Sequence, residues 1–219
     1  MRELGPGLWH WEAPHPGWSS ESDWLQVVSS YAVADRERLL LFDPIAPPRE
    51  IEELAATREV VVLLTAPWHE RDTRSLVERF SAPVYVPPPD TEQDLMEKFG
   101  VTVEQAAGGS PDVAWLFAGD SFEAHTYLAG DRLPVGVEAL PGREHNDLLL
   151  WIESHRAVTF GDTLEDLGHG LQITPWLRAG VTREQVAERL RPLLALPVEH
   201  VLATHGGPMD RAALERALA

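Results

Sequence analysis

Short apolar runs, separated by polar turns and by turns that contain glycine or proline, recur along most of the 219-residue chain. Many of these runs are rich in valine, leucine or aromatic residues, a composition that is typical of β-strands. The pattern predicts strands over residues 24–33, 38–42, 60–64, 84–86, 113–117, 122–127, 135–139, 147–152, 157–160 and 198–203.

Fewer segments have the apolar spacing of a helix. One of them begins at Thr182 and carries Gln185 three positions later, which is the capping-box pattern of a helix N-terminus. Pro192 should kink or end this helix, because proline has no backbone N–H to donate. The pattern predicts helices over residues 49–56, 74–80, 91–99, 182–194 and 210–218.

The order of the predicted elements indicates the class of fold. Strands come first, then strand–helix units, then a run of strands, and finally another strand–helix unit. Two mixed sheets covered by helices fit this order better than an alternating parallel fold does. The length suits one large domain or two small ones, and we expect one domain over residues 1–219.

Composition narrows the possible partners and the possible chemistry. The net charge of −17 opposes binding to nucleic acid and to anionic membranes, so we expect a small-molecule partner. No cysteine is present, which excludes disulfides and thiolate metal sites. The sequence shows neither a secretory signal nor an apolar run long enough to span a bilayer, so we expect a cytoplasmic protein.

Polar clusters follow four of the predicted strands. Asp43 follows one strand, the sequence APWHERD at residues 66–72 follows the next, and Asp162 and His205 follow two strands near the C-terminus. A fifth cluster, PGREHND at residues 141–147, precedes a strand. Histidine and carboxylate side chains can bind metals and transfer protons, so these clusters are the candidate functional residues.

The order and spacing of these clusters resemble the metallo-β-lactamase superfamily over nearly the whole chain. Asp43 resembles the family's early aspartate at a strand end, residues 63–65 resemble the lead-in to its first histidine motif, and Asp162 in FGDTL resembles its metal-bridging aspartate. His205 in THGGP resembles the histidine of its final turn. The resemblance implies an α/β (α+β) fold, a four-layer αββα sandwich of two mixed sheets flanked by helices. It also implies hydrolase activity on a small-molecule ester, lactone, thioester or amide.

The metal-binding motif of the family is degenerate in this chain. The family pattern His-x-His-x-Asp-His, placed without gaps after Thr65, falls on the sequence Ala-Pro-Trp-His-Glu-Arg at residues 66–71. The family's next histidine follows a Pro-Gly pair, but here that position is Arg143. Zinc needs about three protein ligands, and an arginine beside a cation repels it. The standard dinuclear zinc site is therefore predicted to be lost or remodelled.

The sequence favours a site without a cofactor, in which two arginines replace the positive charge of the metal. Arg71 and Arg143 would pair with Glu70 and Asp162, and a spare guanidinium face could bind a small anion. The protein would then be a catalytically inactive binding or scaffold domain that uses the same cleft.

Two other interpretations stay open. His69 and His145 could join Asp162 and His205, with Glu70 nearby, in a relocated mononuclear site for zinc, iron or manganese. Alternatively, Asp162 could orient His205 as a general base without any metal. The expected catalytic residues are thus Asp162, His205 and Glu70, and the expected substrate contacts are Arg71, Arg143, Trp68 and His15.

Overall fold

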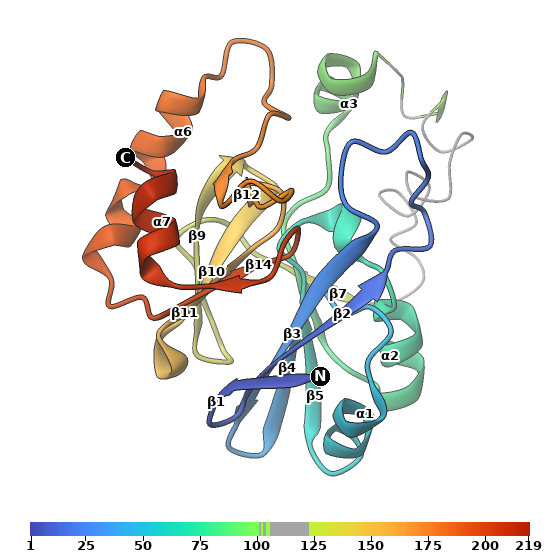
Figure 1. Cartoon of the computed structure of the whole chain (residues 1–219). Helices are drawn as coiled ribbons and strands as arrows, with labels where there is room; N and C mark the ends of the chain where they lie inside the picture. The colour runs from blue at the N-terminus through green and yellow to red at the C-terminus, as the bar shows by residue number, and fades with distance from the viewer. Residues whose placement is uncertain (101, 103, 106–122) are drawn as a thin grey trace.

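Two β-sheets lie face to face in the centre of the molecule, and helices cover their outer faces (Figure 1). The computed structural model describes residues 1–100, 102, 104–105 and 123–219. The predicted strand over residues 113–117 lies outside the described residues. The layers, from one side to the other, are helices, sheet, sheet and helices, which confirms the predicted αββα sandwich.

The first sheet is mixed and has seven strands. The strands from β1 to β4 pair antiparallel, and those from β4 to β7 pair parallel. Its order is β1 (Arg2–Gly5), β2 (Leu8–Pro14), β3 (Val27–Asp35), β4 (Arg38–Phe42), β5 (Glu59–Leu63), β6 (Val84–Val86) and β7 (Ala124–Thr126).

The second sheet is also mixed and has six strands. Only β11 and β14 pair parallel within it. Its order is β15 (Pro208–Met209), β14 (His200–Ala203), β11 (Ala157–Phe160), β10 (Asp147–Ile152), β9 (Val137–Glu144) and β8 (Arg132–Leu133). A short ladder of β12 (Leu164–Glu165) and β13 (Gln172–Ile173) follows β11.

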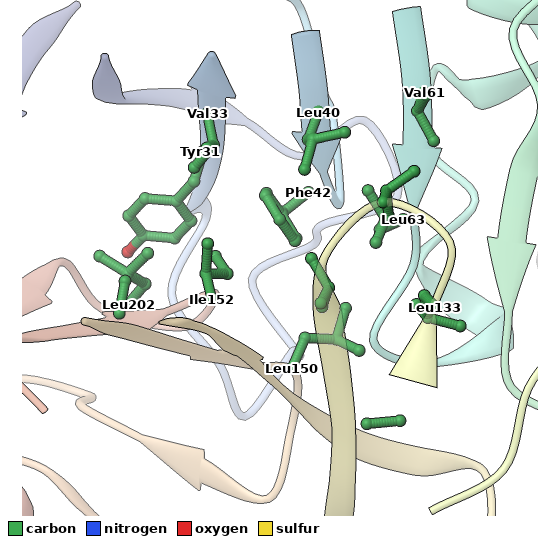
Figure 2. Close-up of a cluster of buried hydrophobic side chains, with 14 of the residues drawn as sticks. Tyr31, Val33, Leu40, Phe42, Val61, Leu63, Leu133, Leu150, Ile152 and Leu202 are labelled. Carbon is green, nitrogen blue, oxygen red and sulfur yellow. The ribbon is translucent and has the colours of Figure 1, made fainter. Parts of the chain in front are cut away.

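Alternate side chains from both sheets form the central core. Tyr31, Phe42 and Leu63 of the first sheet face Leu150 and Leu202 of the second (Figure 2). All of them are at most 1% exposed, and the Tyr31 hydroxyl donates to the carbonyl oxygen of Ala203 at 2.7 Å. Burying this apolar area supplies most of the force that holds the sheets together.

Helices close the sandwich on both sides. α1 (Arg49–Ala55) and α2 (Thr73–Phe80) pack on the first sheet through Ile51 and Leu76. α6 (Arg183–Leu190) and α7 (Arg211–Ala217) pack on the second sheet through Val186 and Leu214. α3 (Glu92–Phe99) lies at one end of the sandwich (Figure 1). Among the helices of the described residues, none is long and apolar enough to cross a membrane.

Proline explains one difference from the predicted elements. The predicted helix over residues 182–194 ends as an α-helix at Leu190 and continues as a 3-10 turn, η3 (Arg191–Ala195). Pro192 cannot donate to the preceding turn, so the α-helical ladder stops there. The predicted capping box of Thr182 and Gln185 is present.

Candidate metal centre

Two parallel strand pairs deliver the polar clusters to one edge of the sandwich. Phe42 at the end of β4 pairs with Leu63 at the end of β5. Phe160 at the end of β11 likewise pairs with Ala203 at the end of β14. Residues that follow paired strand ends start side by side, so chain segments far apart in sequence converge at this edge.

His69, Asp162 and His205 form a compact buried cluster there. The Nε2 atoms of both histidines lie 3.2 Å from Asp162 Oδ1, and one ligand atom from each of the three side chains lies within 4.8 Å of the others. The three residues are 4–8% exposed. Both nitrogens therefore contact the same carboxylate oxygen, from two sides of the site.

Asp43 orients His69 from the opposite side of the ring. Asp43 Oδ2 lies 3.1 Å from His69 Nδ1, and this carboxylate also accepts hydrogen bonds from the Thr65 amide and hydroxyl and the Thr204 hydroxyl. Burial alone would lower the pKa of His69, but the carboxylates of Asp43 and Asp162 outweigh it and raise that pKa to about 9. In the absence of a cation, His69 is therefore an imidazolium between two carboxylates.

The second oxygen of Asp162 has its own partners. Trp68 Nε1 donates to Asp162 Oδ2 at 2.7 Å, and Arg143 Nη2 lies 3.4 Å from the same oxygen. Although burial opposes it, the contacts with His69 and His205 hold the pKa of Asp162 well below its ordinary value. Asp162 is therefore ionised, with one oxygen toward the histidines and the other toward Trp68 and Arg143.

Arg143 connects the cluster to a second buried carboxylate. Its Nε lies 2.6 Å from Asp147 Oδ2, and its Nη1 donates to the Trp176 carbonyl oxygen at 2.5 Å. Burial raises the pKa of Asp147 to about 6 even though Arg143 opposes the shift. The sequence prediction had placed Arg143 beside Asp162, as the structure does, but it had not identified Asp147.

Arg71 and Glu70 have different partners from those expected. Arg71 Nη1 donates to the carbonyl oxygens of Ser29 and Asp43, at 3.0 and 2.7 Å. This arginine therefore links the start of β3 to the residue that follows β4. The Glu70 carboxylate faces Arg74, with Oε1 3.6 Å from Nε. The expected pairing of Arg71 with Asp162 or Glu70 does not form between these described side chains.

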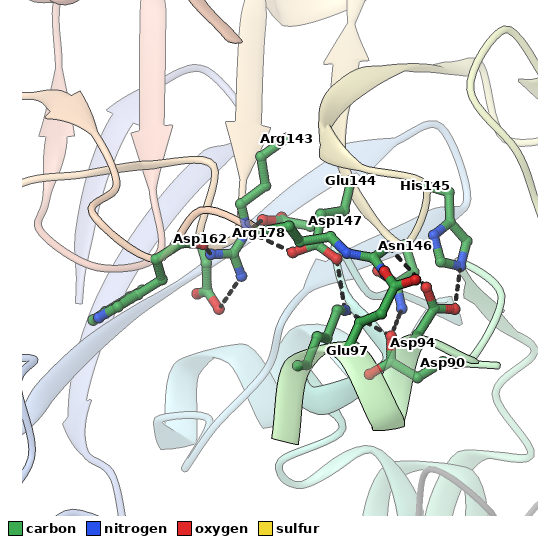
Figure 3. Close-up of polar contacts among 12 residues, drawn as sticks. Asp90, Asp94, Glu97, Arg143, Glu144, His145, Asn146, Asp147, Asp162 and Arg178 are labelled. Carbon is green, nitrogen blue, oxygen red and sulfur yellow. Dashed lines mark hydrogen bonds and ion pairs between the residues drawn. The ribbon is translucent and has the colours of Figure 1, made fainter. Parts of the chain in front are cut away.

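His145 lies outside the cluster. Its Nε2 is 3.6 Å from Asp94 Oδ2, and its side chain is 41% exposed. Figure 3 shows it beside Asp94, at the far end of a polar network from Asp162. The chain turns between β9 and β10, which carries His145 toward α3 instead of toward His205. The relocated four-ligand set is thus reduced to three residues.

Aromatic side chains cover the His205 side of the cluster. The ring centroids of Trp24 and Trp176 lie 5.4 and 6.1 Å from that of His205. The rings of His15 and Trp24 meet edge-on, with centroids 5.1 Å apart, so Trp24 lies between His15 and His205. Trp176 Nε1 also donates to Asp23 at 2.6 Å. The sequence assigned Trp24 to a strand that in fact begins at Val27, and nothing in the sequence marked Trp176.

The sequence matches no protein-family model and no curated protein. The structure is similar to that of a metallo-β-lactamase family protein from Thermus thermophilus, TTHA1429, with a TM-score of 0.64 and 16% identity over 98% of this chain and 78% of that one. The B3 metallo-β-lactamase BLEG-1 is similar with a TM-score of 0.60 and 16% identity, over 95% of this chain and 97% of that one. TTHA1623, solved in a di-iron-bound form, is similar with a TM-score of 0.57 and 25% identity, over 87% of this chain and 93% of that one. The chain has the metallo-β-lactamase fold.

Within the metallo-β-lactamase fold of this chain, the cluster could hold a metal ion. Ligand atoms about 2.1 Å from a tetrahedral zinc lie roughly 3.4 Å from one another, close to the two observed separations of 3.2 Å, and all three ligand atoms lie within 4.8 Å of one another. Two imidazoles and a carboxylate suit zinc, iron or manganese. The contact between Asp43 and His69 is the carboxylate–histidine arrangement that commonly supports a metal ligand.

Proposed function

We propose that this chain is a hydrolase of metallo-β-lactamase fold whose active centre holds a single metal ion on His69, Asp162 and His205. The convergence of these three buried ligand atoms on an edge of the sandwich carries the proposal. The similar TTHA1623 structure was solved in a di-iron-bound form, which supports metal binding by a protein of this fold. The proposed substrate is a small-molecule ester, lactone, thioester or amide.

Each residue of the proposed centre has a separate role. Asp43 holds His69 Nδ1, which leaves His69 Nε2 free to act as a ligand once its proton has left. Asp162 contributes Oδ1, and Trp24 and Trp176 limit the access of water to His205. A bound metal ion would supply a Lewis acid that polarises a carbonyl group and lowers the pKa of water. Glu70 is not part of this proposal, because its carboxylate faces Arg74.

A specific observation favours a second candidate, a metal-free binding domain. The imidazolium of His69 lies between Asp43 and Asp162, and Arg143 approaches Asp162 from the other side. These two cations offset the buried carboxylates without any metal, as the charge-replacement interpretation requires. In this version His69 takes the role that the sequence had assigned to Arg71.

Metal content decides between the two candidates. The untagged protein is purified without chelators, then incubated with zinc, Fe(II) or Mn(II), and the metal per chain is measured by elemental analysis. We expect about one ion per chain in the wild type and in His145→Ala, and almost none in His69→Ala and His205→Ala. His145→Ala is the matched control, since His145 lies outside the cluster.

Activity is then tested on the metal-loaded protein with a panel of esters, lactones, thioesters and amides. We expect hydrolysis that requires the bound metal and is lost in His205→Ala. A wild-type protein that takes up no metal under any of these conditions would support the metal-free binding domain. Stoichiometric metal without hydrolysis of any substrate class would contradict the enzymatic part of the proposal.

A further inference from the structure

Trp68 occupies one of the positions where the family motif has a histidine ligand. It lies in a short 3-10 turn, η1 (Pro67–His69), so it is followed directly by His69. These two successive side chains contact the two oxygens of one carboxylate. His69 Nε2 approaches Asp162 Oδ1 at 3.2 Å, while Trp68 Nε1 donates to Asp162 Oδ2 at 2.7 Å.

The Trp68 ring is itself held by two cations. Lys98 Nζ lies 5.2 Å from the ring centroid and Arg143 Cζ lies 5.8 Å from it. Lys98 is fixed by ion pairs with Asp90 and Glu144 at 2.7 and 2.6 Å. Its side chain is 11% exposed, so these contacts are largely shielded from solvent. Cation–π contacts of this kind restrict the ring to one orientation.

Asp162 Oδ2 is therefore already occupied. A cation that bound this oxygen would have to displace the indole N–H and would lie next to the guanidinium of Arg143. Both changes are unfavourable, because a buried donor would lose its acceptor and two positive charges would meet. Asp162 Oδ1, in contrast, lies 3.2 Å from the Nε2 atoms of His69 and His205, the two other proposed ligands.

We propose that Trp68 is a positioning residue that reserves Asp162 Oδ2, so that Asp162 binds a metal through Oδ1 alone and the centre holds one ion instead of two. The inference rests on the proposed function, since it concerns the same centre. In this arrangement Trp68 and Arg143 together stand in for the second metal of the family site.

Cobalt(II) binding tests the role of Trp68. The visible spectrum of bound cobalt(II) reports the coordination number of the ion. If Trp68 only stabilised the fold, replacing it would leave that coordination number unchanged. Trp68→Phe keeps a ring for Lys98 and Arg143 but removes the N–H donor. We expect the cobalt bands of Trp68→Phe to weaken, because Oδ2 becomes a further ligand and raises the coordination number. Trp11→Phe is the matched control, because it also loses an indole N–H but that group donates to the carbonyl oxygen of Ile45.

Nuclear magnetic resonance of the wild type gives a second readout that does not depend on a variant folding well. With ¹⁵N-labelled tryptophan, the Trp68 indole N–H should shift when zinc is added and stay protected from exchange with solvent. Rapid exchange of that N–H in the zinc-loaded protein would show that Oδ2 has been released and would overturn the inference.

The two proposals fail in different ways. If the wild type binds neither cobalt nor zinc, the proposed function fails. If the wild type binds one ion but Trp68→Phe has the same spectrum, affinity and stoichiometry as the wild type, only the role of Trp68 fails.

Discussion

Asp43 and His69 form the contact on which the candidate centre depends. Asp43 Oδ2 lies 3.1 Å from His69 Nδ1, and the carboxylate is fixed by hydrogen bonds from Thr65 and Thr204. Since one ring nitrogen is held in this way, the other is directed at Asp162. The contact therefore selects both the orientation of the ring and the nitrogen that is left to bind a metal.

Replacing Asp43 by asparagine should weaken metal binding without abolishing it. Loss of a carboxylate behind a histidine ligand typically lowers metal affinity by about 10–100-fold. Isothermal titration with zinc would measure the change. Asp35→Asn is the control and should match the wild type, because the Asp35 carboxylate contacts Arg38 at 3.9 Å and lies outside the cluster. Unchanged affinity in Asp43→Asn would mean that the contact does not position His69.

Glu165 should make stability depend on pH in a defined direction. It is fully buried, and neither of its carboxylate oxygens has a hydrogen-bond partner among the described residues. Burial and the negative charge of Asp162 raise the pKa of Glu165 from 4.5 to about 7, although the positive charge of Arg143 acts to lower it. Between these two values the folded protein holds a proton that the unfolded chain has released, so this group's contribution to stability is lost as the pH rises from about 4.5 to 7.

Glu165→Gln removes this ionisation while keeping the shape of the side chain. Relative to the wild type, the variant should gain free energy of unfolding as the pH is raised from about 5 to about 8, on the order of 1–3 kcal/mol. Denaturant unfolding at several pH values would measure the difference, with exposed Glu78→Gln as the control. A constant difference across this range would contradict the assigned pKa.

Removal of the metal should leave the protein folded. The hydrophobic core clusters do not include the ligands, and Asp162 keeps its contacts with Trp68 and Arg143. A metal present at about 100 times its dissociation constant adds roughly 2.7 kcal/mol to stability. Chelation should therefore lower Tm by about 5–10 °C and leave the circular dichroism spectrum unchanged. Unfolding in chelator at room temperature would disprove this expectation.

Gly161 should tolerate no side chain. A Cβ at this position would lie 2.7 Å from Thr65 Oγ1 and 2.9 Å from His69 Cε1. Gly161→Ala should displace His69, reduce metal affinity at least about tenfold and cost about 1–3 kcal/mol of stability. Gly207→Ala is a close control, because its nearest neighbour, Glu12 Oε1, is 3.9 Å away. Metal titration and thermal unfolding of both variants would test the difference, and equal behaviour would refute it.

Local sequence signals were sufficient for much of the fold. The valine-rich run before Thr65 predicted β5, and the capping box at Thr182 predicted the start of α6. These features depend on neighbouring residues, whose apolar spacing and capping groups act within a few positions. Trp24 was misassigned to a strand, since its aromatic character favours β-structure equally well in a covering loop.

The sequence by itself predicted that the dinuclear motif of the family it resembles is incomplete, because Ala66, Trp68 and Arg143 cannot serve as histidine ligands. Only the tertiary structure decided which histidine reaches the site. His69 and His145 are equivalent as residue types, but η1 directs one toward Asp162, whereas the turn after β9 directs the other toward Asp94. The physical reason is that side-chain direction depends on the backbone path between strands, and that path is fixed by the packing of the two sheets.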